Sequence, residues 1–411
     1  MMELALLTGA SAFGVAGGTW GSVADMSTPR ISPGVTALNG TIYAVGGGSS
    51  MTSIYSSGSL HGECGWLKSG EAYNPTADTW SAIANMTSAR AGMGFAALNG
   101  ILYVVGGSDG GSSPLKSGEA YDPATDSWSA IANMSVPRNF VGLAALDGKL
   151  YAVGGRGGGP SQPAAACLKS GEVYDPVLDT WSNLPDMSTG RSLLGLAALD
   201  GKVFAVGGTP DGGTQIASVE AYDPATNSWG AVAPMSAGRD DLSAAALNGK
   251  IYAVGGFVTS SGEVYDLATD SWSALASMVS ARDSLGLAVL NGKADVDMGK
   301  LFAVGGFDGA TVLKSAEAFT PTAAFSCNST EGIPRHGICV LDPLGNQTAE
   351  QCLDSCRCVV HNCGQLNGTV QCGAVLAGCN VCDSCCQSYF HQHSCDGCFA
   401  APVSEQGCGG Q

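Results

Sequence analysis

The chain has 411 residues, which is enough for one large repeat domain and a smaller second domain. Its formal net charge of −17 argues against nucleic acids and anionic membrane surfaces as partners, because both carry negative charge themselves. No stretch of about eighteen apolar residues occurs, so the sequence predicts no membrane-spanning helix.

The first 18 residues allow two interpretations. Residues 4–7 are apolar and Ala10-Ser11-Ala12 has the small residues of a cleavage site, which favours a secretory signal. Glu3, however, stands where such a signal carries positive charge, and the apolar run is short. We therefore expect residues 1–18 to be either a signal-like segment or a truncated start.

Residues 19–321 repeat one pattern six times, with a period of 48 to 60 residues. Each unit has an apolar run that ends in a Gly-Gly pair, then a variable loop, then Ser-x-Glu-x-aromatic. In the first five units a Trp follows that aromatic residue by seven positions. Such self-similarity indicates a repeat architecture in which each unit packs on its neighbours. The Gly-Gly pairs occupy residues 46–47, 106–107, 154–155, 207–208, 255–256 and 305–306.

Each unit contains four strand signals in the same order. The first is small and apolar, as in residues 142–146, and Asp147-Gly148 then predicts a tight hairpin turn. The second ends at the Gly-Gly pair, and the third carries the Glu-x-aromatic motif. A turn such as residues 122–126, with Pro and Asp, leads to the fourth, which carries the Trp. Four antiparallel strands in each unit predict the blade of a β-propeller.

The two ends of the repeat predict how the propeller closes. The sixth unit, residues 282–319, has no Trp strand after it, whereas a Trp strand at residues 19–23 precedes the first unit. Joining the two completes the sixth blade and leaves no open sheet edge. We therefore expect an all-β, six-bladed propeller over residues 19–321, with Trp20 on the outer strand of the blade that holds Phe319.

The repeat resembles the kelch family. The resemblance rests on Arg-x(n)-Gly-x-Ala-x-Leu-Asn-Gly-Lys-Ile-Tyr-Ala-Val-Gly-Gly, then Ser-x-Glu-x-Tyr-Asp-Pro, then Asp-Ser-Trp, and it covers about three quarters of the chain. It implies that the loops between second and third strands share one face with the links between blades, and that this loop face is the binding face. A fold hosts many functions, so the ligand is left open.

Several loops depart from the common pattern. The loop at residues 48–68 is long and contains His61 and Cys64, and the third loop contains Cys167. The two cysteines are expected either to bridge across blade two or to remain separate thiols. An extended hairpin at residues 293–300 carries two aspartates, which we expect to be solvated, because calcium needs six or more oxygen ligands.

An arginine follows a methionine by four residues at every blade junction. Symmetry places these six guanidinium groups in a ring near the channel mouth. In the kelch-like substrate adaptors that the repeat resembles, arginines at this position line a pocket for acidic peptides, and the guanidinium fork suits carboxylates. The predicted binding residues are Arg30, Arg90, Arg138, Arg191, Arg239 and Arg282.

The same arginines have a structural alternative. Each unit supplies one Glu, and six buried Arg–Glu pairs would lock neighbouring blades without being available to a ligand. The sequence leaves open which role applies to each arginine. The candidate partners are Glu71, Glu119, Glu172, Glu220, Glu263 and Glu317.

Catalytic interpretations find less support. The copper radical oxidases among kelch propellers need several His ligands, and this propeller contains only His61. Other kelch propellers act on sialic acid, and Asp240, Asp241 and Asp283 are candidates for proton transfer, unless they are solvated loop residues. We expect no catalytic residue, no cofactor and no metal site.

Residues 322–411 are expected to form a separate disulfide-rich domain, because 14 of the 16 cysteines lie there. Cys379-x-x-Cys382 and Cys395-x-x-Cys398 have the spacing of zinc ligands, but the dense, irregular cysteines around them favour disulfides. The glycosylation sequons agree with a secreted protein. They lie at Asn39, Asn85, Asn133, Asn328, Asn346 and Asn367.

The sequence thus predicts a monomeric, non-catalytic binding protein of the extracellular space or secretory pathway. Its loop face is expected to recognise an acidic protein, peptide or glycan. The first alternative is an enzyme acting on acidic sugars, similar to a sialic-acid mutarotase or epimerase. The second is a cytoplasmic ubiquitin-ligase adaptor, against which the lack of a recognisable docking segment before the propeller counts.

Overall fold

The computed structural model describes residues 17–50, 65–110, 113–157, 167–290 and 299–321, with the backbone of β27 (Gln365–Leu366) and β28 (Thr369–Val370). The chain divides into two compact units, Met1–Pro321 and Thr322–Gln411. In the second unit, β27 and β28 pair antiparallel. The cysteines and sequons predicted there lie outside the described residues. Within the described ranges, no helix has the length and apolar character needed to cross a membrane.

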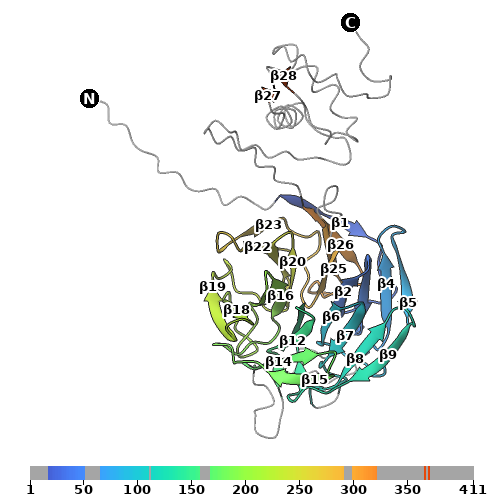
Figure 1. Ribbon diagram of the computed structural model, residues 1–411. Helices are drawn as coiled ribbons and strands as arrows, with labels where there is room; N and C mark the ends of the chain where they lie inside the picture. Colours follow the sequence, from blue (N-terminus) through green and yellow to red (C-terminus); the bar gives the residue numbers. More distant parts are fainter. Residues whose placement is uncertain are drawn as a thin grey trace. The chain divides into compact units, whose positions relative to one another are not determined.

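The first unit is built from six four-stranded antiparallel sheets arranged around a central axis (Figure 1). The predicted all-β, six-bladed propeller is confirmed. Blades one to three consist of β2 (Gly34–Leu38), β3 (Thr41–Val45), β4 (Gly70–Asn74) and β5 (Thr79–Ile83); β6 (Gly94–Leu98), β7 (Ile101–Val105), β8 (Gly118–Asp122) and β9 (Ser127–Ile131); and β11 (Gly142–Leu146), β12 (Lys149–Val153), β14 (Gly171–Asp175) and β15 (Thr180–Asn183).

Blades four to six complete the ring. They consist of β16 (Gly195–Leu199), β17 (Lys202–Val206), β18 (Val219–Asp223) and β19 (Ser228–Val232); β20 (Leu242–Leu247), β21 (Lys250–Gly255), β22 (Gly262–Asp266) and β23 (Ser271–Leu275); and β24 (Gly286–Leu290), β25 (Lys300–Val304), β26 (Ala316–Pro321) and β1 (Gly18–Val23). A separate two-stranded ladder joins β10 (Arg138–Asn139) to β13 (Arg156–Gly157) on the loop face.

The N-terminal strand closes the ring as the sequence predicts. Strand β1 pairs antiparallel with β26, and Trp20 lies opposite Phe319. The two rings are 5.3 Å apart between centroids, and Trp20 Nε1 donates a hydrogen bond of 2.8 Å to the Ala276 carbonyl of the previous blade. The outer strand of blade six therefore comes from the opposite end of the propeller chain, which leaves no unpaired edge on β26.

The Asn-Gly and Asp-Gly signals correspond to the innermost hairpin turns of the first five blades. In each, the Asn or Asp has φ between 48° and 51°, and the Gly has φ between 71° and 83°. Two successive residues with positive φ are the signature of a type I′ turn, whose twist matches that of the flanking strands. These five turns lie on the face opposite the loop face.

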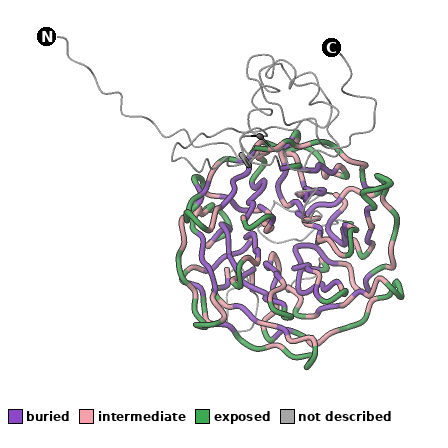
Figure 2. Tube along the Cα trace, turned by 45° about the horizontal axis from the view of Figure 1, so that its top comes forward, coloured by how far each residue is buried: buried purple, intermediate pink, exposed green. Residues whose placement is uncertain are grey.

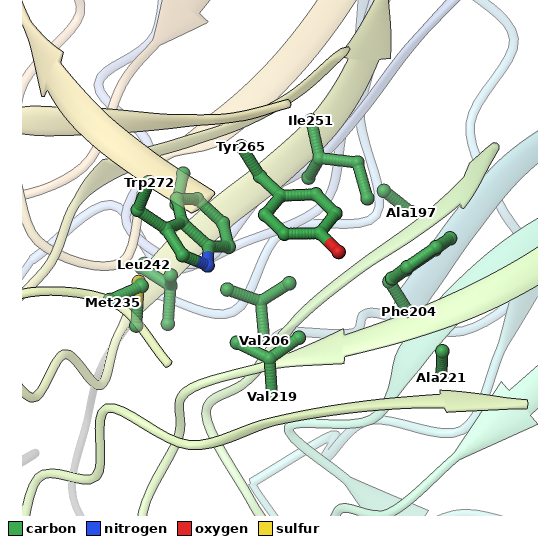
Figure 3. Close-up of a cluster of buried hydrophobic side chains, with 11 residues drawn as sticks. Ala197, Phe204, Val206, Val219, Ala221, Met235, Leu242, Ile251, Tyr265 and Trp272 are labelled. Atoms are coloured by element: carbon green, nitrogen blue, oxygen red, sulfur yellow. The ribbon is translucent and has the colours of Figure 1, made fainter. Parts of the chain in front are cut away.

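The core lies between blades, and burial is highest in the second strand of each sheet (Figure 2). Outer strands such as β5 and β9 alternate toward solvent. Between blades four and five, the Tyr265 ring lies 5.2 Å from that of Trp272 and 6.0 Å from that of Phe204 (Figure 3). Bulky aromatic residues thus fill the space that widens outward between neighbouring sheets. The buried members of this cluster are Ala197, Phe204, Val206, Val219, Ala221, Met235, Leu242, Ile251, Ala253, Tyr265 and Trp272.

Candidate functional site

All six arginines predicted to form a binding ring are buried and ion-paired. The most exposed, Arg239, is 7% accessible, and four of the six are at 0%. Each guanidinium lies 2.9 to 3.2 Å from the Glu of its own blade. Each also donates to the first carbonyl of the Gly-Gly pair and to a Ser carbonyl, as Arg138 does to Gly154 (3.0 Å) and Ser170 (2.7 Å).

These contacts join neighbouring blades. The Arg138 side chain reaches into blade three, whereas its carbonyl accepts a hydrogen bond of 2.8 Å from Gly107 of blade two. The glycine before it, Gly106, has φ of 65°, and a Cβ there would collide with the same Arg138 carbonyl. The Gly-Gly pair is therefore required by the closeness of the next blade.

The electrostatics favour charged pairs at these junctions. Burial alone would raise the pKa of Glu71, but hydrogen bonds from Ser27 and Arg30 outweigh it and hold that pKa below its ordinary value. Burial lowers the pKa of Arg30, and its ion pair with Glu71 opposes that effect. The structure thus has the Arg–Glu pairs that the sequence left open as an alternative. Ligand binding by the ring stays a prediction, and the burial of the guanidinium groups counts against it.

A different ring of residues lines the channel mouth. It consists of the second residue after each arginine, and all six have positive φ, from 50° to 61°. Each backbone N–H donates to the carbonyl of the corresponding residue in the preceding blade, at 2.6 to 3.3 Å, so the six hydrogen bonds form a closed circle. The members of this mouth ring are Ser32, Gly92, Phe140, Leu193, Asp241 and Ser284.

The mouth ring narrows the channel. The cavity lined by the ring and by the first residues of the innermost strands has a volume of about 150 Å³. Pockets that hold a small organic ligand are usually about 300 to 1,000 Å³. The channel itself is therefore too small for a sugar or a cofactor, and a ligand of this face would bind above it.

Among the described residues, carboxylates gather at the mouth in blades five and six. Asp283 is fully buried and Asp240 is 6% accessible. Both carboxyl oxygens of Asp283 lack a hydrogen-bond partner among the described residues, and so does Oδ1 of Asp240. Asp241 is half-buried, belongs to the mouth ring and accepts 2.9 Å from Ser284 Oγ. The expectation that these aspartates are solvated loop residues is wrong for Asp240 and Asp283.

The three carboxylates repel one another electrostatically. Burial raises the pKa of Asp241 to about 7, and repulsion from Asp240 adds to it. Burial likewise raises the pKa of Asp283 to about 7, with repulsion from Asp241, Asp240 and Asp308. Within the described ranges, no group of three or more His, Cys, Asp or Glu side chains is arranged to hold a metal ion.

Arg156 places a positive charge near two members of this group. Its guanidinium is 6.0 Å from the centroid of the Phe140 ring and partly offsets the raised pKa of Asp240 and Asp241. A Cβ at Gly212 would collide with Arg156 Nη2, so the guanidinium lies directly against the blade-four loop. Arg156 is the arginine of the described propeller that stands outside the six Arg–Glu junctions.

An apolar loop borders the carboxylates. Phe257 is 59% and Val258 37% accessible, although both are large apolar side chains. Val258 has φ of 45°, a strained conformation for a β-branched residue. The loop is held by Gly256, whose N–H donates 3.2 Å to the carbonyl of Arg282, the residue before Asp283. This apolar loop and the neighbouring carboxylates form the blade 5–6 rim, which consists of Phe257, Val258, Asp240, Asp241 and Asp283.

Aligning the six repeats shows how this rim departs from the others. The residue after the Gly-Gly pair is Phe only at Phe257 and Phe307, and the innermost strand has Ser243 where the other five blades have Gly. An acidic residue directly follows the junction arginine only at Asp240 and Asp283. The rim thus differs from the other blades in the sequence itself, whereas the predicted binding ring relies on the arginine that all six repeats share.

The structure describes only some of the other residues that the sequence singled out, namely Cys167 and three of the sequons. Cys167 has a free thiol 3.2 Å from Ser192 Oγ, while Cys64 and His61 lie outside the described residues. The aspartates of the hairpin at residues 293–300 also lie outside them. The sequon residues Asn39, Asn85 and Asn133 are exposed.

Comparison with known proteins decides the family. The kelch motif matches residues 29–87, 89–135, 137–188, 190–236 and 238–279, which together make up more than half of the chain. The chain belongs to the kelch-repeat family. The sixth blade lies beyond these five matches, and its outer strand comes from the N-terminal end of the propeller.

Similar kelch proteins match over short stretches. The chain is 35% identical over 99 residues to Kelch-like ECH-associated protein 1B of Danio rerio, covering 24% of this chain and 15% of that protein. It is 34% identical over 90 residues to an F-box/kelch-repeat protein of Arabidopsis thaliana, covering 22% and 20%. The fold is also similar to the solved structure of YjhT. The match includes 72% of this chain and 95% of the YjhT chain, with a TM-score of 0.59 and 17% sequence identity. The YjhT likeness supports the fold alone.

Proposed function

We propose that this kelch propeller is a non-catalytic binding module that holds a partner protein on its loop face, at the blade 5–6 rim. The observation that carries the proposal is the exposure of Phe257 and Val258 on a loop that borders buried carboxylates. Large apolar side chains in the centre of a contact contribute most of the affinity of protein interfaces. The small channel cavity supports a surface contact rather than an enclosed ligand.

A secretory location is proposed alongside this function. It is supported by the density of cysteines after residue 326 and by the exposure of Asn39, Asn85 and Asn133. The predicted acidity of the partner rested on the arginine ring. Because those guanidinium groups are taken up by Arg–Glu pairs, acidity is not part of the proposal.

Site-specific photo-cross-linking tests the proposed face. A photoreactive residue at Phe257 should give an adduct with one partner protein in an extract of the producing cells. The matched control is Leu178, which is 68% exposed on the turn between β14 and β15, on the opposite face. Adduct from Leu178 in place of Phe257 would overturn the proposal.

A second candidate is an enzyme that moves a proton on an acidic sugar. Asp241 and Asp283 favour it, because a carboxyl whose pKa is raised to about 7 is suited to acid–base work near neutral pH. The small cavity argues against it. Faster anomer exchange of N-acetylneuraminate in NMR spectra, lost in Asp241→Asn, would establish this function instead.

A further inference from the structure

We propose that the blade 5–6 rim recognises a segment of the partner that presents a cationic side chain beside an apolar one. This inference rests on the proposed function and specifies its partner chemistry. It also predicts a positively charged partner segment, whereas the arginine ring predicted an acidic partner. Four features of the rim carry it, namely its carboxylates, its apolar loop, the position of Arg156 and the charge of the chain.

Three carboxyl oxygens of the rim are buried without a hydrogen-bond partner among the described residues. Asp283 is fully buried, with both oxygens lacking partners, and Asp240 has one such oxygen. Burial of a charged carboxylate without a donor is strongly unfavourable, so a nearby positive charge would stabilise the ionised form of this group. Asp241 is the member that lines the channel mouth and remains partly accessible. An ammonium or guanidinium group at Asp241 would form a charge-assisted hydrogen bond there and reduce the repulsion from Asp240 and Asp283 behind it.

The apolar part lies directly beside this acidic part. Phe257 follows Gly256, which is hydrogen-bonded to the Arg282 carbonyl, one residue before Asp283. Val258 leans toward blade six, where its Cγ1 lies about 3.0 Å from the position that a Cβ of Gly309 would take. A residue next to the partner's cation in sequence would therefore meet Phe257 or Val258 while the cation meets Asp241.

Arg156 limits where the cation can lie. Its guanidinium lies against the blade-four loop at Gly212, and its charge partly offsets the raised pKa values of Asp240 and Asp241. A second cation is repelled by Arg156, so the partner's cation is directed to the accessible part of Asp241 that lies away from Arg156. The net charge of −17 adds a long-range attraction for a basic segment, which speeds its association at low salt.

A peptide segment fits this rim better than a metal ion or a small organic cation. The described residues contain no metal-binding group of three ligands, and the cavity is about 150 Å³. An exposed Phe–Val pair has no function toward a bare cation, but it suits a partner that supplies an apolar side chain as well as a cation.

Selection from a displayed library of random peptides of about twelve residues, panned against the full chain, tests the inference. Lys or Arg next to an aromatic or aliphatic residue should be enriched. By fluorescence anisotropy, a selected peptide should bind at least tenfold more weakly to Asp241→Asn and to the double variant Phe257→Ser/Val258→Ser. Asp186→Asn, an exposed aspartate at another blade junction, and Val177→Ser/Leu178→Ser on the opposite face are the matched controls and should bind as the wild type does.

The outcomes separate the inference from the proposed function. Selected peptides that are acidic or uncharged, lose affinity in Phe257→Ser/Val258→Ser and are indifferent to Asp241→Asn would overturn the cationic partner and leave the protein-binding rim standing. Peptides that lose affinity only in Val177→Ser/Leu178→Ser would overturn both. Melting curves of each variant establish that the affinities refer to folded protein.

Discussion

The blade junctions and the blade 5–6 rim both bury charge, but they treat it in opposite ways. At a junction, the buried Arg138 donates to Glu172 and to two backbone carbonyls. At the rim, the equally buried Asp283 has no donor among the described residues. In the part of the propeller that the structure describes, the junction arrangement occurs six times and the rim arrangement once. In a repeat protein, what every unit shares maintains the fold, and what one unit changes is where a partner is expected.

Removing strand β1 should have the largest effect on the molecule. Deletion of residues 1–26 leaves the outer edge of β26 unpaired and exposes the Phe319 ring, so the open edge should drive aggregation. The measurement is the soluble yield and light scattering of the truncated chain. A monomeric truncation with unchanged thermal stability would contradict ring closure through β1.

Breaking two junctions should have the next largest effect. Arg138→Ala with Arg191→Ala strands Glu172 and Glu220 in the interior, at about 3–5 kcal/mol per broken pair. We expect denaturant unfolding to reveal a severe loss of stability. The matched control is Lys149→Ala, which removes a surface pair with Asp175 and should cost no more than about 1 kcal/mol. Equal losses in both variants would erase the contrast between junction and surface.

Removing the buried charge of the rim should increase the stability of the protein, and the gain should grow as the pH rises from 4 to 8. Asp283 has a pKa raised to about 7, above the value of about 4 in the unfolded chain, so the folded state retains its proton between these values. The contribution of protonated Asp283 to the free energy of unfolding is complete below pH 4 and is lost as the pH rises to about 7. Asp283→Asn should therefore gain stability relative to the wild type, by on the order of 2–4 kcal/mol, between pH 4 and pH 8. Thermal unfolding across this range checks it, and a difference independent of pH would contradict it.

The smallest expected change is at Val258. Its φ of 45° suits glycine better than a β-branched residue, so Val258→Gly should keep or raise stability, by up to about 1 kcal/mol. The same variant should weaken partner binding, because an exposed apolar contact is lost. A stabilised variant with full affinity would mean that the strained valine has no part in binding.

The sequence was sufficient to predict the blades, because each is defined by local signals. Asn99-Gly100 specifies its own type I′ turn, and the position of Trp20 before the first repeat requires closure of the ring. These signals act within a hairpin or through the count of repeats. No contact between distant residues has to be known in advance.

The site was harder to predict, because the same residue type can serve two roles. Arg138 in a sequence can face a ligand or Glu172, and only the direction of its side chain distinguishes the two. The burial of Asp283 depends on how the loop at Gly256 packs against the neighbouring blade. Both depend on tertiary packing, although the departures at Asp240 and Phe257 are visible once the repeats are aligned.

Hydrogen–deuterium exchange of the propeller, with and without the partner captured at Phe257, tests most directly that the rim rather than the arginine ring is the binding site. The account predicts new protection at residues 239–243, 256–259 and 283–285, with little change at residues 176–179 on the opposite face. Protection spread evenly over all six blade junctions, or confined to the turns of the opposite face, would contradict it.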